Sequence, residues 1–171
     1  MASNANFISQ FVMGGDPCTY KESGELQAEM SKLTHPARPD VDWRQVEKLC
    51  LALFRQNGVE LQTLVCYVLA ITRRQGLAGM ADGLGSLDIL LQRWADFWPV
   101  QVHSRISLLS WVTEKMQQAL RTLDIQYQDL PQIYRCVQHL SAIETTLQQC
   151  ELWHMTKLDL LAGQFRNTAL R

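Results

Sequence analysis

The sequence lacks the features that several large classes of protein require. It has no uninterrupted apolar run of about 18 residues, so we expect no segment that spans a membrane. Its 16 basic and 17 acidic residues leave a formal net charge of -1. A nucleic-acid binder needs a concentrated basic surface to neutralise phosphates, and this balance of charges predicts none. The sequence therefore predicts neither a membrane span nor a nucleic-acid partner.

Motifs of common catalytic and nucleotide-binding sites are also missing. There is no G-x-x-x-x-G-K-[ST] phosphate loop, and Gly83-x-Gly85 lacks the third glycine and the preceding strand of a dinucleotide-binding turn. No G-x-S-x-G nucleophile motif occurs, and Asp96, Asp124 and Asp129 form no recognisable acid and base pair. We therefore predict no catalytic residue, no cofactor and no enzymatic activity.

Cysteine is odd in number, which argues against a disulfide framework. No export signal precedes the cysteines, because the N-terminal stretch around Phe7 and Phe11 is too short and too polar. Several cysteines fall on faces that we expect to be apolar, so we predict reduced thiols in a cytosolic protein. The five are Cys18, Cys50, Cys66, Cys136 and Cys150.

One pattern of cysteine and histidine leaves an alternative open. Cys136-x-x-His139 and Cys150-x-x-x-His154 each place two metal-ligating side chains on one side of a helix. A continuous helix would hold the two cysteines about 21 Å apart, too far for one tetrahedral zinc. Only a hairpin break or a helix from a second chain would unite them. We predict no metal, and keep a small metal- or thiol-dependent enzyme, with Cys136 as nucleophile, as a remote alternative.

The sequence does contain helical periodicity along most of its length. Apolar residues recur at three-and-four spacing in six or seven segments, and no segment has the alternation of a strand. This predicts an all-α fold, a single compact bundle of six or seven helices that ends in a long helix or a helical hairpin. Residues 1–19 carry little pattern and should form a flexible segment before one helical domain over residues 20–171.

The centre of the fold is predicted to be a helical hairpin. Asp42 can accept hydrogen bonds from the amides of a first turn, so a helix should begin at Trp43. The next helix, about Val59 to Gln75, is apolar around most of its circumference, which is typical of a helix surrounded by others. Gly58 and Gly76 suit the left-handed backbone that often follows a helix end.

Glycine is concentrated in the segment that follows the hairpin. A helix is expected from about Ala78 to Trp94, although Gly79, Gly83 and Gly85 lie within it. Each glycine costs roughly 1 kcal/mol in a helix relative to alanine, so close packing against a neighbour should compensate.

Three further helical segments complete the chain, and the first of them is expected from Lys21 to Leu33. Ser104 should cap a helix that reaches about Thr122, and Asp129 should cap the last segment. No glycine or proline interrupts that segment before Gly163. It is therefore either one long helix or a pair that breaks near residues 150–154.

Three regions are candidates for contact with a partner. The densest aromatic cluster, Trp94 to Pro99, either closes a helix end as core or anchors another protein. The loop His35 to Asp40 is a second candidate. The outer side of the last helix is a third, and its surplus of apolar residues suggests self-association. The candidate partner-binding residues are His35, Arg38, Trp94, Trp98, His103 and Trp153.

An ordered set of short motifs resembles one known family. The motifs are Gly15-Asp16-Pro17, Leu33-Thr34-His35-Pro36-Ala37-Arg38-Pro39-Asp40-Val41-Asp42-Trp43-Arg44, Gly76-Leu77-Ala78-Gly79-Met80-Ala81-Asp82-Gly83-Leu84, and Trp98-Pro99 with His103, Arg105 and Trp111. In this combination the sequence resembles the N-terminal domain of the TssA/ImpA family of bacterial type VI secretion proteins. The stretch from Ser31 to Pro39 and the long last helix look most like the VasL/TagA branch of TssA-like accessory proteins.

The resemblance implies a function in binding rather than in catalysis. It implies a cytoplasmic domain of a longer protein that also has an inner-membrane segment and a C-terminal domain. Such proteins are understood to contact the TssA cap or the distal sheath end and to stop and hold sheath polymerisation. TssA itself, which acts in baseplate and tail-sheath assembly, is the alternative. The partners implied are TssA, sheath or baseplate subunits, and a homo-oligomer stays open.

Overall fold

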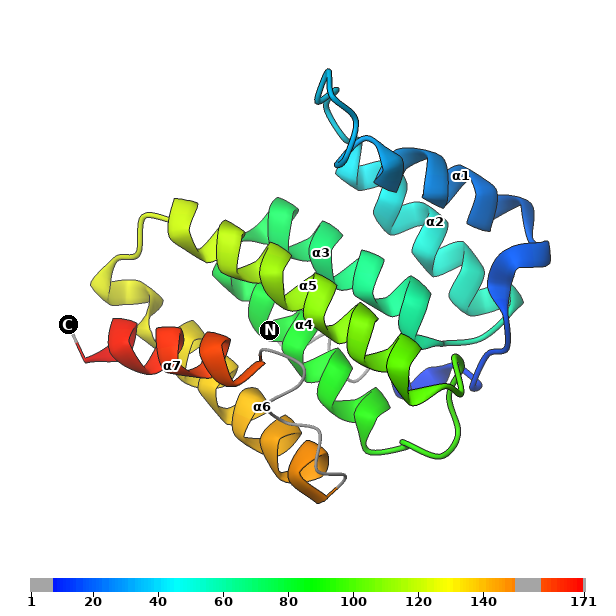
Figure 1. Cartoon of the computed structure of the whole chain (residues 1–171). Coiled ribbons are helices and arrows are strands. Elements are labelled where there is room, and N and C mark those ends of the chain that lie inside the picture. The colour runs from blue at the N-terminus through cyan, green and yellow to red at the C-terminus, as the bar shows by residue number, and fades with distance from the viewer. Residues whose placement is uncertain (1–7, 150–157, 171) are drawn as a thin grey trace.

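A computed structural model describes residues 8–149 and 158–170, and these residues form the expected all-α bundle (Figure 1). Within this part of the chain there is no β-strand, only an isolated bridge between Met13 and Val59. The helices are α1 (Lys21–Ser31), α2 (Trp43–Gln56), α3 (Leu61–Gln75), α4 (Leu77–Leu91), α5 (Val102–Thr122), α6 (Leu130–Gln149) and α7 (Leu158–Ala169). Two short 3-10 helices, η2 (Pro17–Thr19) and η3 (Tyr127–Asp129), lie in the connections.

Helix α3 lies at the centre because its sequence is apolar on nearly every side. It packs against α2, α4 and α5, and its residues from Thr63 to Thr72 are all buried. Helix α4 continues the stack, since it contacts both α3 and α6, and α7 packs on α6 and α5. Figure 1 shows the result: the α1–α2 hairpin covers one side of the central helices and the α6–α7 pair covers the other.

Glycines of α4 allow it to approach α3 closely, as the sequence predicted. A Cβ atom built on Gly79 would lie 2.0 Å from the carbonyl oxygen of Ile71, and one built on Gly83 would lie 2.7 Å from Cγ1 of Val68. Gly76, which joins the two helices, has a φ of 64° that favours glycine. The packing gained at these positions offsets the low helix propensity of glycine.

The predicted cap of α2 is confirmed. Helix α2 begins at Trp43, and the Asp42 carboxylate accepts a hydrogen bond from the Gln45 amide at 3.1 Å. Gly58, two residues beyond the end of α2, has a φ of 99° as expected.

Of the two other predicted caps, the one by Ser104 is wrong. Helix α5 begins at Val102, and the Arg105 amide donates to the Gln101 carbonyl. Ser104 lies between these two residues and is therefore part of the first helical turn. Asp129 immediately precedes α6, which begins at Leu130 as predicted, and its carboxylate accepts from the Gln126 amide at 2.8 Å within η3. Ser104 has capping chemistry but lies at the third residue of α5, inside the helix.

One helix length differs from expectation, and one open alternative is decided. Helix α4 ends at Leu91, so Trp94 lies in the connection that follows and not in the helix. The last segment forms the hairpin α6–α7 rather than one long helix. Cys150, Trp153 and His154 lie outside the described residues.

Residues 12–15, part of the segment that we expected to be flexible, pair with the turn between α2 and α3. The side chain of Ile8 is 1% exposed. The Gly14 amide donates to the Val59 carbonyl, and the Val59 amide donates to the Val12 carbonyl, each at 2.8 Å. This short pairing has no periodic pattern, so sequence reasoning had no signal for it.

A buried carboxylate caps the central helix. Glu60 is fully buried at the start of α3, where it accepts from the amides of Gln62 at 2.6 Å and Thr63 at 2.8 Å. Burial raises the pKa of Glu60 from its ordinary value of 4.5 to about 7, because the loss of hydration outweighs the two amide hydrogen bonds. The folded chain therefore holds a proton that the unfolded chain releases near pH 4.5.

Because the folded pKa is the higher one, this group's contribution to stability is present at low pH and is lost as pH rises through about 7. We expect the free energy of unfolding to fall by about 2 kcal/mol from this source between about pH 5 and pH 8. Glu60→Gln keeps an acceptor oxygen but cannot ionise. The difference in free energy between wild type and variant, measured by urea unfolding across this range, should change by that amount. A difference that is constant with pH would contradict the prediction.

Candidate partner-binding site

The Arg105 guanidinium organises the connection between α4 and α5, residues 92–101. Its side chain is 3% exposed, and its Nε donates to the Pro99 carbonyl at 2.6 Å. Its two terminal nitrogens donate to the carbonyls of Phe97, at 2.5 Å, and Trp94. One buried cation thus satisfies three carbonyl groups that no helix or sheet uses.

Aromatic rings enclose the same guanidinium. Its central carbon lies 3.9 Å from the centroid of the Phe97 ring and 4.6 Å from that of the Trp94 ring, within the range of cation–π attraction. The two rings meet edge to face at 5.7 Å. Trp98 connects the cluster to the core, because its carbonyl accepts from the Leu61 amide at the start of α3.

The aromatic side chains of this cluster differ in how far they are buried. Phe97 is fully buried, whereas Trp94 and Trp98 are only partly buried. His103 is exposed on the first turn of α5. A role of Trp94, Trp98 and His103 in partner contact therefore stays a prediction.

Sequence reasoning missed the central role of Arg105. Arg105 is buried on α5, whereas its neighbour Ile106 is partly exposed. The sequence did contain one indication of this role, because Arg105 belongs to the family-like motif that begins at Trp98-Pro99.

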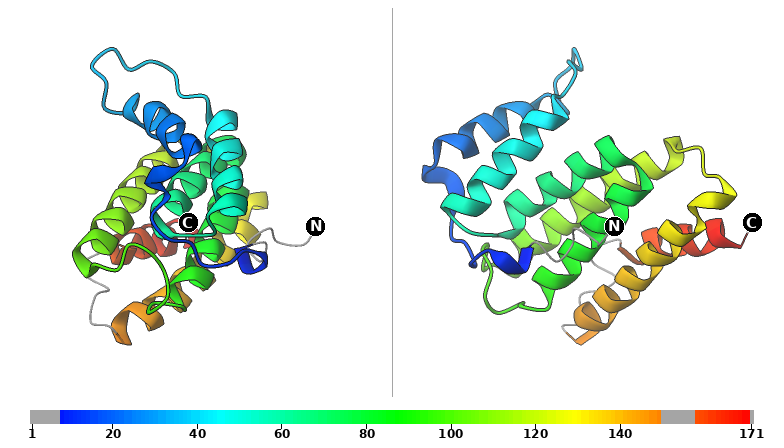
Figure 2. Two further views of the ribbon diagram at one scale, coloured as in Figure 1. Left: turned by 90° about the vertical axis from the view of Figure 1, so that its right-hand side faces the viewer. Right: turned by 180° about the vertical axis from the view of Figure 1, so that it is seen from behind.

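The other candidates lie away from this cluster. His35 and Arg38 are exposed in the loop between α1 and α2, which extends from the end of that hairpin (Figures 1 and 2). The His35 Nδ1 accepts from the Ala37 amide at 3.0 Å, and Arg38 has a φ of 47°. Trp153 lies outside the described residues. On α7, Leu160 is 60% exposed, so the self-association predicted for the last helix stays open.

A groove runs between α1 and α5, with α3 as its floor; we call it the α1–α3–α5 groove. Its apolar half has a volume of about 380 Å³. The apolar side chains come from all three helices: Met30 from α1, Val65 from α3, and Leu108 and Trp111 from α5. Leu33, just after α1, belongs to both halves of the groove.

The second half of the groove is basic. It has a volume of about 760 Å³, and the loop after α1 forms one wall. Four cationic side chains line it: Lys32, Arg38, Arg73 and Lys115. Asp40 is the single carboxylate in the same lining. This half concentrates positive charge on a chain whose formal net charge is -1.

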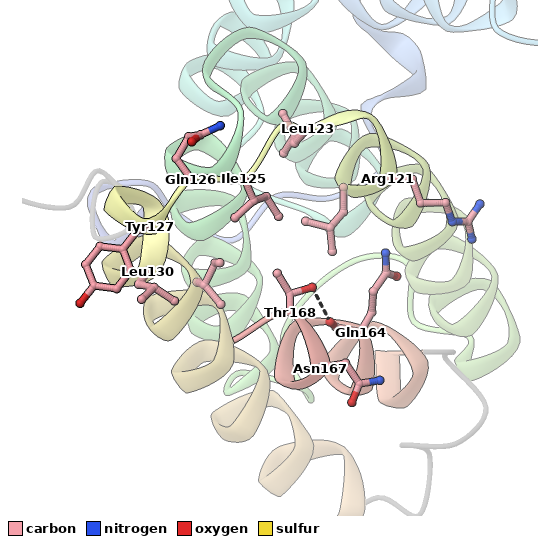
Figure 3. Close-up of a pocket in the computed structure, with 11 residues that line it drawn as sticks. Arg121, Leu123, Ile125, Gln126, Tyr127, Leu130, Gln164, Asn167 and Thr168 are labelled. Atoms are coloured by element: carbon pink, nitrogen blue, oxygen red, sulfur yellow. Dashed lines mark hydrogen bonds between the residues drawn. The ribbon is translucent and has the colours of Figure 1, made fainter. Parts of the chain in front are cut away.

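A further pocket lies at the other end of α5 (Figure 3). Its volume is about 600 Å³, and it is bounded by the end of α5, the connection to α6 and the face of α7 that carries Gln164, Asn167 and Thr168. The Thr168 hydroxyl donates to the Gln164 carbonyl at 2.9 Å, as Figure 3 shows. Arg121 is the one charged side chain among the described lining residues, so the pocket has no concentrated charge.

The remote enzymatic alternative has little support in the described residues. Cys136 is fully buried, and burial raises the pKa of its thiol to about 12, which disfavours the nucleophilic thiolate. The His139 Nδ1 lies 3.7 Å from a carboxylate oxygen of Asp88. No group of three or more metal-ligating side chains occurs in residues 8–149 and 158–170, and the other half of the proposed pattern lies outside them.

None of the described helices is long and apolar enough to cross a membrane. The described helices form a bundle in which Arg105 holds the connection between α4 and α5 and a groove lies open at the surface. An exposed apolar surface rimmed by polar residues often marks a site of contact with another protein. Residues 8–114 match the family described as ImpA, N-terminal, type VI secretion system. The match covers more than half of the chain, so the chain belongs to this family and is a component of the type VI secretion system. No curated protein and no solved structure gives a match.

Proposed function

We propose that the chain is an interaction module of the type VI secretion apparatus and acts as a TssA-like accessory protein of the VasL/TagA type. In this role it contacts the TssA cap or the distal sheath end, and it stops and holds sheath polymerisation. The family match over residues 8–114 supports a place in the secretion apparatus, and the resemblance of Ser31 to Pro39 to the accessory branch supports the finer role. The protein acts in the cytoplasm, and the domain belongs to a longer parent that is anchored in the inner membrane.

The loop between α1 and α2 supports this choice of branch. The stretch from Ser31 to Pro39 resembles the accessory branch, and residues 34–40 are all exposed. Pro36 and Pro39 restrict the backbone there, so ordering the loop against a partner costs less conformational entropy than for an ordinary loop. His35 and Arg38 are our candidates for contact in this loop.

The family match also supports a second function. The chain could be the N-terminal domain of TssA itself, acting in baseplate and tail-sheath assembly. The two functions differ in timing, because an assembly factor is needed to build a sheath, whereas a stopping factor is needed only once the sheath has grown across the cell.

Imaging a fluorescent sheath subunit in cells that lack the gene separates the two. If the chain is the accessory protein, sheaths should assemble but should fail to stop and stay extended at the distal side of the cell. If it is TssA, few or no sheaths should form. Restoring the full gene is the control. Unchanged sheath assembly and arrest in the deletion strain would contradict both functions.

A further inference from the structure

We propose that the α1–α3–α5 groove binds an amphipathic helix of a type VI secretion subunit, which places an apolar stripe in the apolar half and carboxylates beside the basic half. The inference rests on the proposed function, since it requires a protein partner. It adds the surface that is used and the chemistry that this surface recognises.

The shape of the groove fits one helix. Helices α3 and α5 run in the same direction along it, because both contribute their N-terminal halves to the apolar part and their C-terminal ends to the basic part. The lining of α3 extends from Gln62 to Arg73, and that of α5 from Ser107 to Gln118. Each stretch is about 16 Å long, or roughly three helical turns. Helix α1 and the loop after it form the opposite wall.

The apolar half provides what a helix in a groove needs. Val65 and Cys66 form a buried floor, whereas Leu108 and Trp111 are partly exposed along the wall formed by α5. Met30 lies on the opposite wall, and its flexible side chain can adapt to an incoming residue. Apolar side chains at three-and-four spacing on the partner would cover this surface and remove it from water.

The charges of the basic half favour a partner that carries carboxylates. Lys32 is already compensated, because its Nζ lies 2.9 Å from the Glu29 carboxylate. Arg73 lies over the Trp43 ring at 5.6 Å but, like Arg38 and Lys115, has no carboxylate partner in the described part of the chain. These cations outnumber the one carboxylate in the lining, so carboxylates on the partner are favoured and cations are disfavoured.

Photocrosslinking in the native bacterium tests the groove directly. The photoreactive residue p-benzoylphenylalanine replaces Leu108 in the apolar half of the full-length protein. In a matched control it replaces Tyr127, an exposed aromatic residue in the pocket of Figure 3. We expect Leu108 to crosslink to a helical segment of a type VI secretion subunit that carries acidic residues, and Tyr127 not to crosslink to that segment.

Charge reversal then tests the basic half. Arg73→Glu combined with Lys115→Glu should reduce the crosslink from position 108 by at least about tenfold. Arg121→Glu, on the same helix α5 but outside the groove, should leave the yield unchanged. Both changes are at charged positions that are not part of the core, and matching circular dichroism and thermal unfolding of the variants would show that the fold is intact.

The outcomes separate this inference from the proposed function. A crosslink from position 108 to an acidic helix of a protein outside the secretion system would support the groove and contradict the function. A type VI subunit captured only from position 127 would support the function and overturn the groove. No crosslink from position 108, a crosslink to the same chain or to a second copy, a basic or non-helical target, or a yield unaffected by charge reversal would each overturn the groove.

Discussion

Replacing Arg105 with alanine should destabilise the domain by about 3 to 5 kcal/mol, more than any other exchange of a charged residue that we propose. The guanidinium is buried and donates to the carbonyls of Trp94, Phe97 and Pro99. Removing it leaves these carbonyls without their donor and opens a cavity between two aromatic rings. Urea unfolding followed by circular dichroism measures the loss.

Two matched variants show whether the effect comes from this geometry. Arg105→Lys keeps the positive charge, but its compact ammonium cannot replace the planar fork, so we expect most of the loss to remain. Arg121→Ala removes an exposed arginine from the last turn of the same helix and should change stability by less than about 0.5 kcal/mol. A loss below about 1 kcal/mol for Arg105→Ala would contradict the role that we assign to this residue.

Gly79→Ala should be the second most damaging change, although helix propensity predicts the opposite. In an exposed helix, replacing glycine by alanine gains up to about 1 kcal/mol. Here the added Cβ would lie 2.0 Å from the Ile71 carbonyl oxygen, which is backbone and cannot rotate away. Helices α3 and α4 would have to separate, so we expect a loss of about 3 kcal/mol, again measured by urea unfolding.

Gly24→Ala is the control for this prediction. Gly24 lies in α1, and a Cβ built there would have no neighbour within 4 Å. We expect this variant to gain about 0.5 to 1 kcal/mol from helix propensity. If Gly79→Ala were as stable as Gly24→Ala, the close contact between α3 and α4 would be disproved.

Gly79 and Arg105 also influence the positions of the helices that form the α1–α3–α5 groove. Gly79 sets how closely α4 approaches α3, which forms the floor. Arg105 fixes the connection from which α5 starts, and α5 forms one wall. A variant that loosens either contact should therefore weaken partner binding as well as stability.

Much of the helical pattern could be predicted because it depends on local chemistry. Asp42 caps the next helix through its own short side chain, and the apolar residues of α3 reveal a helix with neighbours on all sides. Ser104 has the same capping chemistry, but α5 begins two residues before it, at Val102. Local signals identify residues that can cap a helix, but they do not determine which of them does so.

The candidate site was harder to predict because it is assembled from distant segments. The sequence indicated His35 and Arg38 as exposed loop residues, but it contained no sign that Arg38 shares a groove with Arg73 and Lys115. That juxtaposition depends on how the α1–α2 hairpin packs relative to α5. Burial of Arg105 was also hidden, because a charged residue is rarely assigned to a core.

Binding of the purified full-length protein to type VI subunits is the most direct test of an interaction function. Titration calorimetry against TssA and against sheath and baseplate subunits should show saturable binding to at least one of them. That binding should weaken as salt is raised and should be largely lost in the Arg73→Glu, Lys115→Glu variant but retained in Arg121→Glu. Absence of binding to every one of these subunits by correctly folded protein would contradict a role as an interaction module.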